Sequence, residues 1–246
     1  MKKITLLLLC GLLFNTSFAQ LSSKKIDSLV ADALVKFKVA GVSVAIVKDG
    51  KVIHSKGYGM ADINTRKPVN ENTNFQIASN SKAFTTAALA ILEEEGKLKW
   101  TDKVKEHIPE FKMYNEYVTE NFNLQDLLTH RSGLGLGVGD LMFFPDGSNF
   151  TIKDVVTSFQ HFKPVSAFRT QCDYDNLLYI VAGEVIARAS GMSYELFVQK
   201  RIIEPLQMNN TFVGSLLKDR SNLATPHSSE SGIIKTIEAY DIGMGS

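Results

Sequence analysis

A Ser-x-x-Lys step at the start of an apolar helix constrains this chain more than any other stretch of its sequence. The stretch Phe75–Leu92 has the spacing of a helix, and after Lys82 it carries no charged side chain. Residues three apart on a helix share a face, so the Ser79 hydroxyl and the Lys82 amine are within hydrogen-bonding reach. The apolar run predicts a helix that is buried on every side, with Lys82 at the start of its first buried turn.

Such a pair can activate a nucleophile. A serine hydroxyl attacks poorly until a base takes its proton, and a partly desolvated lysine can serve as that base. A buried ammonium group without a partner is costly, so a lysine at this position indicates a function. The four residues alone are a weak motif, because a surface serine beside a solvated lysine gives the same letters.

The N-terminus has the three parts of a secretory signal peptide. Lys2 and Lys3 precede an apolar run from Ile4 to Phe14, and Ser17-Phe-Ala19 supplies small residues before a cleavage site. We expect cleavage after Ala19 and a chain that is periplasmic or secreted. The apolar run is too short for a stable membrane anchor. Acylation of Cys10, as in a lipoprotein, is the alternative, but it leaves an unusually short apolar segment.

Composition argues against a nucleic-acid partner and against a metal centre. Without Lys2 and Lys3 the 27 basic residues fall to 25, against 26 acidic residues, so no basic footprint for nucleic acid is present. Once the signal is removed, Cys172 is the single cysteine, which excludes an intrachain disulfide. The five histidines are scattered without the spacing of metal ligands, and we expect no metal and no other cofactor.

The pattern of apolar residues predicts one α/β domain over residues 20–246, with a mostly helical subdomain over roughly 101–210. Val42–Val47 and Val52–Tyr58 predict two strands joined by an Asp-Gly turn. A single hairpin is not a stable sheet, so it needs further strands. An amphipathic helix is expected over Ser22–Val39, with its buried face made by Leu29, Val30, Ala33, Leu34 and Phe37. Other helices are expected near Thr101–His107, Asn123–Thr129, Thr151–Phe159, Asn176–Ala189 and Tyr194–Ile203.

A second polar cluster, Tyr174-Asp-Asn176, stands directly before the apolar stretch Leu177–Gly183. A tyrosine and an asparagine two residues apart at a helix entry can direct their polar ends to the same side. Asn176 or Asp175 equally fits the role of a plain helix N-cap, which these residue types fill routinely. The sequence leaves both interpretations open.

Three strings in this order make the resemblance to a known family specific. They are Phe75-Gln-Ile-Ala-Ser-Asn-Ser-Lys82, Leu127-Leu-Thr-His-Arg-Ser-Gly-Leu134 and Tyr174-Asp-Asn176, and Ile203-Glu-Pro-Leu-Gln-Met208 follows them. Over nearly all of the mature chain the sequence resembles the class C β-lactamase-like serine hydrolases, which include β-lactamases, D,D-peptidases, D-aminopeptidases and esterases. The resemblance implies the β-lactamase/transpeptidase-like fold, an antiparallel sheet flanked by helices plus a mostly helical subdomain.

The resemblance also implies a role for each matching residue. Ser79 would attack the carbonyl carbon of a β-lactam, D-amino-acid peptide or ester to form an acyl-enzyme, while Lys82 accepts or shares its proton. Tyr174 would pass the proton to the leaving group and later help to activate water, and Asn176 would hold the substrate. A tyrosine is a poor base at its free pKa near 10, so its role needs a nearby cation such as Lys82. His130 has a structural place in the family's pattern, where it supports the active-site loop.

The sequence departs from the family's pattern in two places. Relatives carry a third motif, Lys-Thr-Gly or His-x-Gly, on a strand whose backbone supplies half of the oxyanion hole. Here Lys235-Thr236 is followed by Ile237 and comes too soon after Tyr174 to be that motif. We therefore expect a C-terminally truncated chain that lacks the last strands of the sheet, is weakly active or inactive, and is poorly soluble. Cys172 takes a place often held by a bulky apolar residue, and a buried, inert thiol is expected rather than a substrate-facing one.

The sequence as a whole predicts a serine hydrolase of the Ser-x-x-Lys type that acts on a small molecule or a cell-wall peptide. The alternative is a catalytically impaired protein of the same fold that binds penicillin or a cell-wall peptide with little or no turnover. The residues do not rank the substrates, because one catalytic set serves lactams, D-peptides and esters.

Overall fold

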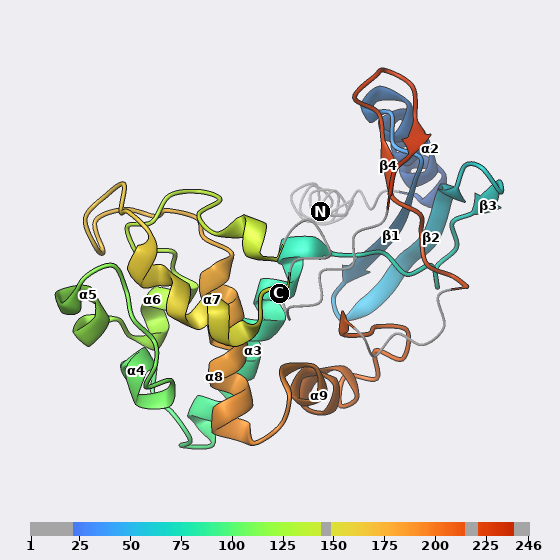
Figure 1. Cartoon of the computed structure of the whole chain (residues 1–246). Coiled ribbons are helices and arrows are strands. Elements are labelled where there is room, and N and C mark those ends of the chain that lie inside the picture. Colours follow the sequence, from blue (N-terminus) through green and yellow to red (C-terminus); the bar gives the residue numbers. More distant parts are fainter. Residues whose placement is uncertain (1–21, 144–148, 215–220, 239–246) are drawn as a thin grey trace, which may run out of the picture. The chain divides into compact units, whose positions relative to one another are not determined.

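The computed structural model describes residues 22–143, 149–214 and 221–238 (Figure 1). The described residues divide into two compact units, one of residues 22–71 with 227–237 and one of the described residues between 72 and 226 with 238. The predicted signal peptide and Cys10 lie outside the described residues, so export stays a prediction. No helix in the described ranges is long and apolar enough to cross a membrane.

The first unit is built on the predicted hairpin. Strands β1 (Gly41–Lys48) and β2 (Lys51–Asp62) pair antiparallel, and the two residues between them, Asp49 and Gly50, have φ angles of 51° and 71°. Positive φ at both central residues is what a type I′ turn requires, and Asp-Gly favours that turn. Strand β3 (Lys67–Pro68) pairs with the far end of β2, which gives the strand order β1-β2-β3.

The second strand pair of this unit contains the Lys-Thr dipeptide that we set apart from the third motif. Strand β4 (His227–Ser228) pairs antiparallel with β5 (Lys235–Thr236). The Thr236 hydroxyl accepts a hydrogen bond of 3.0 Å from the Asn64 side chain. This dipeptide therefore belongs to the unit that does not contain Ser79.

Helix α2 (Ser23–Phe37) has the predicted extent, but its predicted buried face is only partly correct, because Val30, Ala33 and Leu34 are half-buried. Ile26 is buried, whereas Leu29 is 47% exposed and Phe37 is 73% exposed. The helix is attached to β2 by polar contacts near its N-terminus, where the Tyr58 hydroxyl donates to the Asp27 carboxylate at 2.7 Å. Val35 in the last turns is 78% exposed as well, so the end of the helix carries apolar side chains on its surface.

The second unit is helical and is organised around α8 (Leu177–Ser190), which contacts α3, α4, α6, α7 and α9 (Figure 1). The other elements of this unit are η1 (Ala78–Asn80), α3 (Ser81–Glu94), α4 (Val104–His107), α5 (Glu116–Asn121), α6 (Leu124–Leu128), η2 (Asp140–Met142), α7 (Ile152–Ser158), η3 (Phe159–His161), α9 (Tyr194–Val198) and η4 (Gln199–Ile203). The predicted helices are all present within a few residues, except that Tyr194–Ile203 divides into α9 and the π-helical turn η4.

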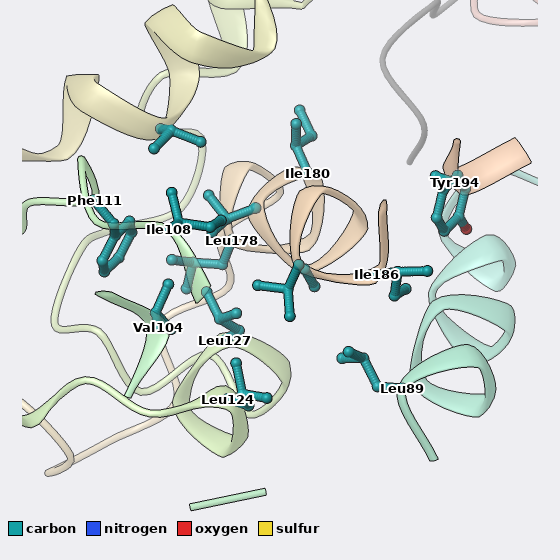
Figure 2. Packing of buried hydrophobic residues seen from close by; sticks show 14 of the residues in the cluster. Leu89, Val104, Ile108, Phe111, Leu124, Leu127, Leu178, Ile180, Ile186 and Tyr194 are labelled. Carbon is teal, nitrogen blue, oxygen red and sulfur yellow. The ribbon is translucent and has the colours of Figure 1, made fainter. Parts of the chain in front are cut away.

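The core of the helical unit lies on both sides of α8. Figure 2 shows Leu178 on the side of Leu127 and Ile186 on the side of Leu89, with α8 between them. All seven residues from Leu177 to Gly183 are buried. A helix that is apolar on every face is stable only inside a core, and α8 meets this condition.

Helix α3 does not have the all-round burial that its sequence predicts. Thr85, Ala88, Leu89 and Leu92 are buried, but Ala83 and Ala87 are exposed. Alanine is apolar yet small enough to stand on a solvent-facing side at little cost, so an alanine-rich run does not define a buried face. The α3 helix is therefore one-sided, and its buried side faces α8 and α9.

Candidate active site

Ser79 lies in the short turn η1, directly before α3, and its side chain is exposed. The preceding residue, Ala78, has a φ of 45°, in the left-handed region that residues other than glycine adopt at a cost. The Asn80 side chain donates to the Ile77 carbonyl at 2.9 Å and closes the turn. Local strain of this kind accumulates where a side chain must be held in one orientation.

Lys82 stands in the first turn of α3 and is half-buried. Its Nζ donates to Ser79 Oγ at 3.1 Å, which is the contact that the three-residue spacing predicts. A second donation, of 2.9 Å, goes to Asn176 Oδ1. The ammonium also lies 5.2 Å from the ring centroids of both Tyr174 and Tyr179, within the range of cation–π attraction.

Tyr174 lies far from Ser79 in the sequence but contacts it in the structure. Its hydroxyl lies 2.7 Å from Ser79 Oγ and donates to it. Burial raises the pKa of Tyr174, but its interaction with the Lys82 ammonium and its hydrogen bond with Ser79 outweigh burial, so the pKa lies below the ordinary 10.0. The phenol is therefore easier to ionise than a free tyrosine.

Asn176 precedes α8, but its side chain does not cap that helix. Capping falls to Asp175, whose Oδ1 accepts the Leu177 backbone N–H at 2.9 Å. The Asn176 amide instead accepts from Lys82 through Oδ1 and donates through Nδ2 to the carboxylate of Asp140. Asp175 therefore caps the helix, whereas the Asn176 side chain is directed toward Lys82 and Asp140.

His130 supports this segment through its backbone and its ring. Its carbonyl accepts the Asp173 N–H at 2.7 Å, and its Nδ1 accepts the Asp175 N–H at 3.2 Å. The His130 and Tyr174 ring centroids are 4.5 Å apart. Burial and the Lys82 charge hold the pKa of His130 below 6.5, which favours the neutral ring that Nδ1 needs in order to accept.

Two acidic residues near these groups were not predicted as part of a site. Asp175 is fully buried, its Oδ2 has no hydrogen-bond partner among the described residues, and burial raises its pKa to about 7. Asp140 is half-buried and lies in a glycine-rich loop. The sequence could have indicated Asp140, because it is an acidic residue that directly follows the glycine-rich stretch Gly133–Gly139. The burial of Asp175 depends on the packing of distant helices and had no such signal.

The expectation that Cys172 is buried is wrong, because its thiol is exposed. The segment before Tyr174 is instead held by Arg169, whose guanidinium donates to both carboxylate oxygens of Asp126 at 2.9 and 2.7 Å. The Phe168 ring packs on Phe122 with centroids 5.6 Å apart. Phe168 and Arg169 are both half-buried, and they anchor this segment while Cys172 lies on the surface.

Among the described residues, no group of three or more His, Cys, Asp or Glu side chains is arranged to hold a metal ion. The residues brought together are a hydroxyl, an ammonium, a phenol and an amide, which is a set that moves protons and binds carbonyl groups.

Comparison with known proteins shows to which family the chain belongs. The family described as Beta-lactamase matches residues 26–241 of the chain. This chain belongs to the beta-lactamase family. The protein Flp of Staphylococcus aureus strain MW2 is a relative that is 32% identical over 194 residues, which are 77% of this chain and 38% of Flp.

Solved structures agree with the family and the fold. The octameric penicillin-binding protein homologue from Pyrococcus abyssi aligns with a TM-score of 0.74 and 27% identity, over 91% of this chain and 53% of that one. A class C beta-lactamase aligns with a TM-score of 0.73 over 89% of this chain and 58% of that one, and its 24% identity bears on the fold alone. The chain thus spans well under two thirds of the length of these beta-lactamase family members.

Proposed function

We propose that this protein is a serine hydrolase that forms an acyl-enzyme on Ser79. One observation carries the proposal: Ser79 Oγ lies within hydrogen-bonding distance of both the Lys82 ammonium, at 3.1 Å, and the Tyr174 hydroxyl, at 2.7 Å. A serine held between two groups that can exchange protons is the arrangement that nucleophilic catalysis requires. Membership of the beta-lactamase family, whose fold hydrolases and penicillin-binding proteins share, supports it.

In the acylation step, the Ser79 oxygen forms a bond to the carbonyl carbon of the substrate. Its proton passes to Tyr174 as phenolate or to Lys82 as free amine, and the carbonyl π electrons move onto oxygen. When the tetrahedral intermediate collapses, the bond to the leaving amine or alcohol breaks and that group takes the proton. A base that has just accepted the Ser79 proton is placed to deliver it.

In the deacylation step, water attacks the ester carbon and Ser79 leaves with the proton restored. Tyr174 is the proposed base for this water, because its interaction with Lys82, which lowers its pKa, does not depend on a free Ser79 hydroxyl. Asn176 is proposed to contact the amide or carboxylate side of the substrate. The lactam, D-amino-acid peptide and ester classes remain candidate substrates, since all three present a carbonyl to the same nucleophile.

The test is to incubate the protein with a fluorescent penicillin and, separately, with a p-nitrophenyl ester. We expect label or nitrophenol release that depends on Ser79, and we expect Ser79→Ala to abolish it. Lys82→Met and Tyr174→Phe should each slow acylation by about two orders of magnitude or more, as the loss of a proton-transfer group does. A retained rate in Ser79→Ala would refute the proposed nucleophile.

The same assay addresses the alternative of a protein that binds without turnover. A stable adduct on Ser79 with no release of product would favour that alternative, whereas several product molecules per protein would favour the hydrolase. Surface serines supply the background control, because Ser193, an exposed helix cap, can be changed to Asn without touching Ser79 or Lys82.

A further inference from the structure

The Asp140 carboxylate has no assigned role, yet it occupies a defined position beside Asn176. Asp140 is the first residue of η2 and follows Gly139, whose φ is 74°. A Cβ on Gly139 would lie 2.5 Å from Leu177 Cδ2 and 2.9 Å from Phe162 Cζ. The loop therefore rests directly on the start of α8 at a place where only glycine fits, and this contact sets Asp140 next to Asn176.

Both carboxylate oxygens of Asp140 accept from the Asn176 amide, at 3.2 and 3.3 Å from Nδ2. On its other side the same amide accepts from Lys82 at 2.9 Å. A carboxylate only accepts and an ammonium only donates, whereas an amide has one donor end and one acceptor end. The two neighbours therefore admit one orientation of the Asn176 side chain, with its nitrogen toward Asp140 and its oxygen toward Lys82.

The orientation of the Asn176 amide affects Ser79 through the hydrogen bonds of Lys82. The Lys82 ammonium has Asn176 Oδ1 and Ser79 Oγ as two of its acceptors, so losing the first releases one of the bonds that aim it at the second. If the amide turned over, its NH₂ would face the ammonium, and two donors would oppose each other. Leaving a charged donor without its acceptor in a half-buried place is costly.

The sign of the Asp140 charge argues against a role in promoting the ionisation of Tyr174. Asp140 is negative, and its charge acts to raise the pKa of Tyr174 and of Asp175, against the Lys82 charge that lowers both. A group placed there to promote a phenolate would be positive. The carboxylate makes ionisation of Tyr174 harder, so its contribution must come from the direction of the hydrogen bonds that it accepts.

We propose that Asp140 is a positioning residue that fixes the Asn176 amide with its oxygen toward Lys82 and so holds the Lys82 ammonium on Ser79. The proposal rests on the proposed acyl-enzyme function of Ser79 and adds a residue to it. Asp140 does not touch the reacting atoms in this scheme, and its effect passes entirely through Asn176.

A double-mutant cycle tests this dependence. Asp140→Ala should lower kcat/KM about tenfold, because it removes two charge-assisted bonds to one amide. Asn176→Ala should lower it at least as much, and the double variant should be within about twofold of Asn176→Ala alone. Strongly coupled residues show this non-additivity, whereas independent ones multiply their effects. Effects that multiply would overturn the proposal.

The conservative variant distinguishes orientation from charge. Asp140→Asn keeps an oxygen that can accept from Asn176 Nδ2, so kcat/KM should return to within about threefold of the wild type. Its loss of charge should also move the ionisation of Tyr174 to lower pH, while Lys82 and His130 still face that ring. A kcat/KM for Asp140→Asn as low as that of Asp140→Ala would contradict an orienting role.

The controls separate failure of the fold and failure of the proposed function. Asp32→Ala, on the exposed surface of α2, removes one negative charge and should leave activity and melting temperature unchanged. The Asn176 side-chain NH₂ signals in a ¹⁵N NMR spectrum should move in Asp140→Ala and stay near the wild type in Asp140→Asn.

If wild-type Ser79 is not acylated, the proposed function fails, and these NMR shifts still decide the orientation of the amide. If acylation proceeds and the cycle is additive, the positioning role fails alone. A rise in KM confined to substrates that carry an ammonium group, with kcat unchanged, would show that Asp140 binds substrate directly and would overturn the proposal.

Discussion

Replacing Asp175 with asparagine should stabilise the protein above neutral pH. The Asp175 carboxyl is fully buried, only its Oδ1 has a partner in the part of the chain that the structure describes, and burial together with the charge of Asp140 raises its pKa from 3.8 to about 7. Asparagine has the same shape and keeps an oxygen to accept the Leu177 N–H, but it does not ionise. The variant should therefore be as stable as the wild type at low pH, and more stable at any pH where the wild type must bury a charged carboxylate.

The magnitude follows from the difference between the two pKa values. Below pH 3.8 the carboxyl is protonated in both the folded and the unfolded chain, so Asp175 adds no pH dependence. Between pH 3.8 and about 7 the unfolded chain releases this proton and the folded chain keeps it, so the free energy of unfolding falls as pH rises. Above pH 7 the deficit is constant and, at about 1.4 kcal/mol per pKa unit, reaches about 4 kcal/mol as an upper bound.

Urea unfolding at pH 3.5 and pH 8, followed by circular dichroism, measures this difference. We expect Asp175→Asn to match the wild type at pH 3.5 and to exceed it at pH 8 by up to about 4 kcal/mol, a shift in melting temperature on the order of 10 °C. The matched control is Asp173→Asn, a less buried neighbour whose carboxylate already has partners, and it should show no such gain. Equal stability of Asp175→Asn and the wild type at pH 8 would refute the buried-acid reasoning.

Further predictions concern the tyrosine and the arginine of the same segment. Because the pKa of Tyr174 lies below 10.0, the acylation rate of the wild type should rise with pH as the phenol ionises. Tyr174→Phe should lose this rise. A pH–rate profile that is unchanged in Tyr174→Phe would show that another group is responsible for the rise. Arg169→Met leaves the buried Asp126 carboxylate without its cation and should cost about 2 kcal/mol in urea unfolding, less than for a fully buried pair because Arg169 is 38% exposed. A change in stability below about 0.5 kcal/mol would show that Asp126 is satisfied by the hydrogen bond that it accepts from the Asn123 backbone N–H.

The hairpin and the contact between Ser79 and Lys82 were predictable because their signals are local. Asp49-Gly50 specifies its own turn, and Ser79 and Lys82 are three apart on one helix, so neither depends on distant packing. The pairing of Ser79 with Tyr174 is different, since no periodicity relates residues so far apart. The resemblance to a family supplied that expectation, and the structure brings the two hydroxyls to 2.7 Å.

What the sequence did not predict depends on neighbours that are remote in the chain. Helix α5 is short and has one buried residue, Val118, so it carries no apolar period and is started by the Asn115 side chain instead. The Arg169–Asp126 ion pair, three residues before the exposed Cys172, joins segments that lie far apart in sequence. Asp140 reaches Asn176 only because its loop packs on α8.

The identity of the nucleophile is the central claim, and mass spectrometry of the labelled protein and of its peptides tests it most directly. The wild-type chain, Ser79→Ala and Ser193→Asn would each be treated with a fluorescent penicillin and digested to locate the adduct. The account predicts one adduct per chain, on the peptide that contains Ser79, present in Ser193→Asn and absent from Ser79→Ala. An adduct of equal yield in Ser79→Ala, or one located on another peptide of the wild type, would contradict it.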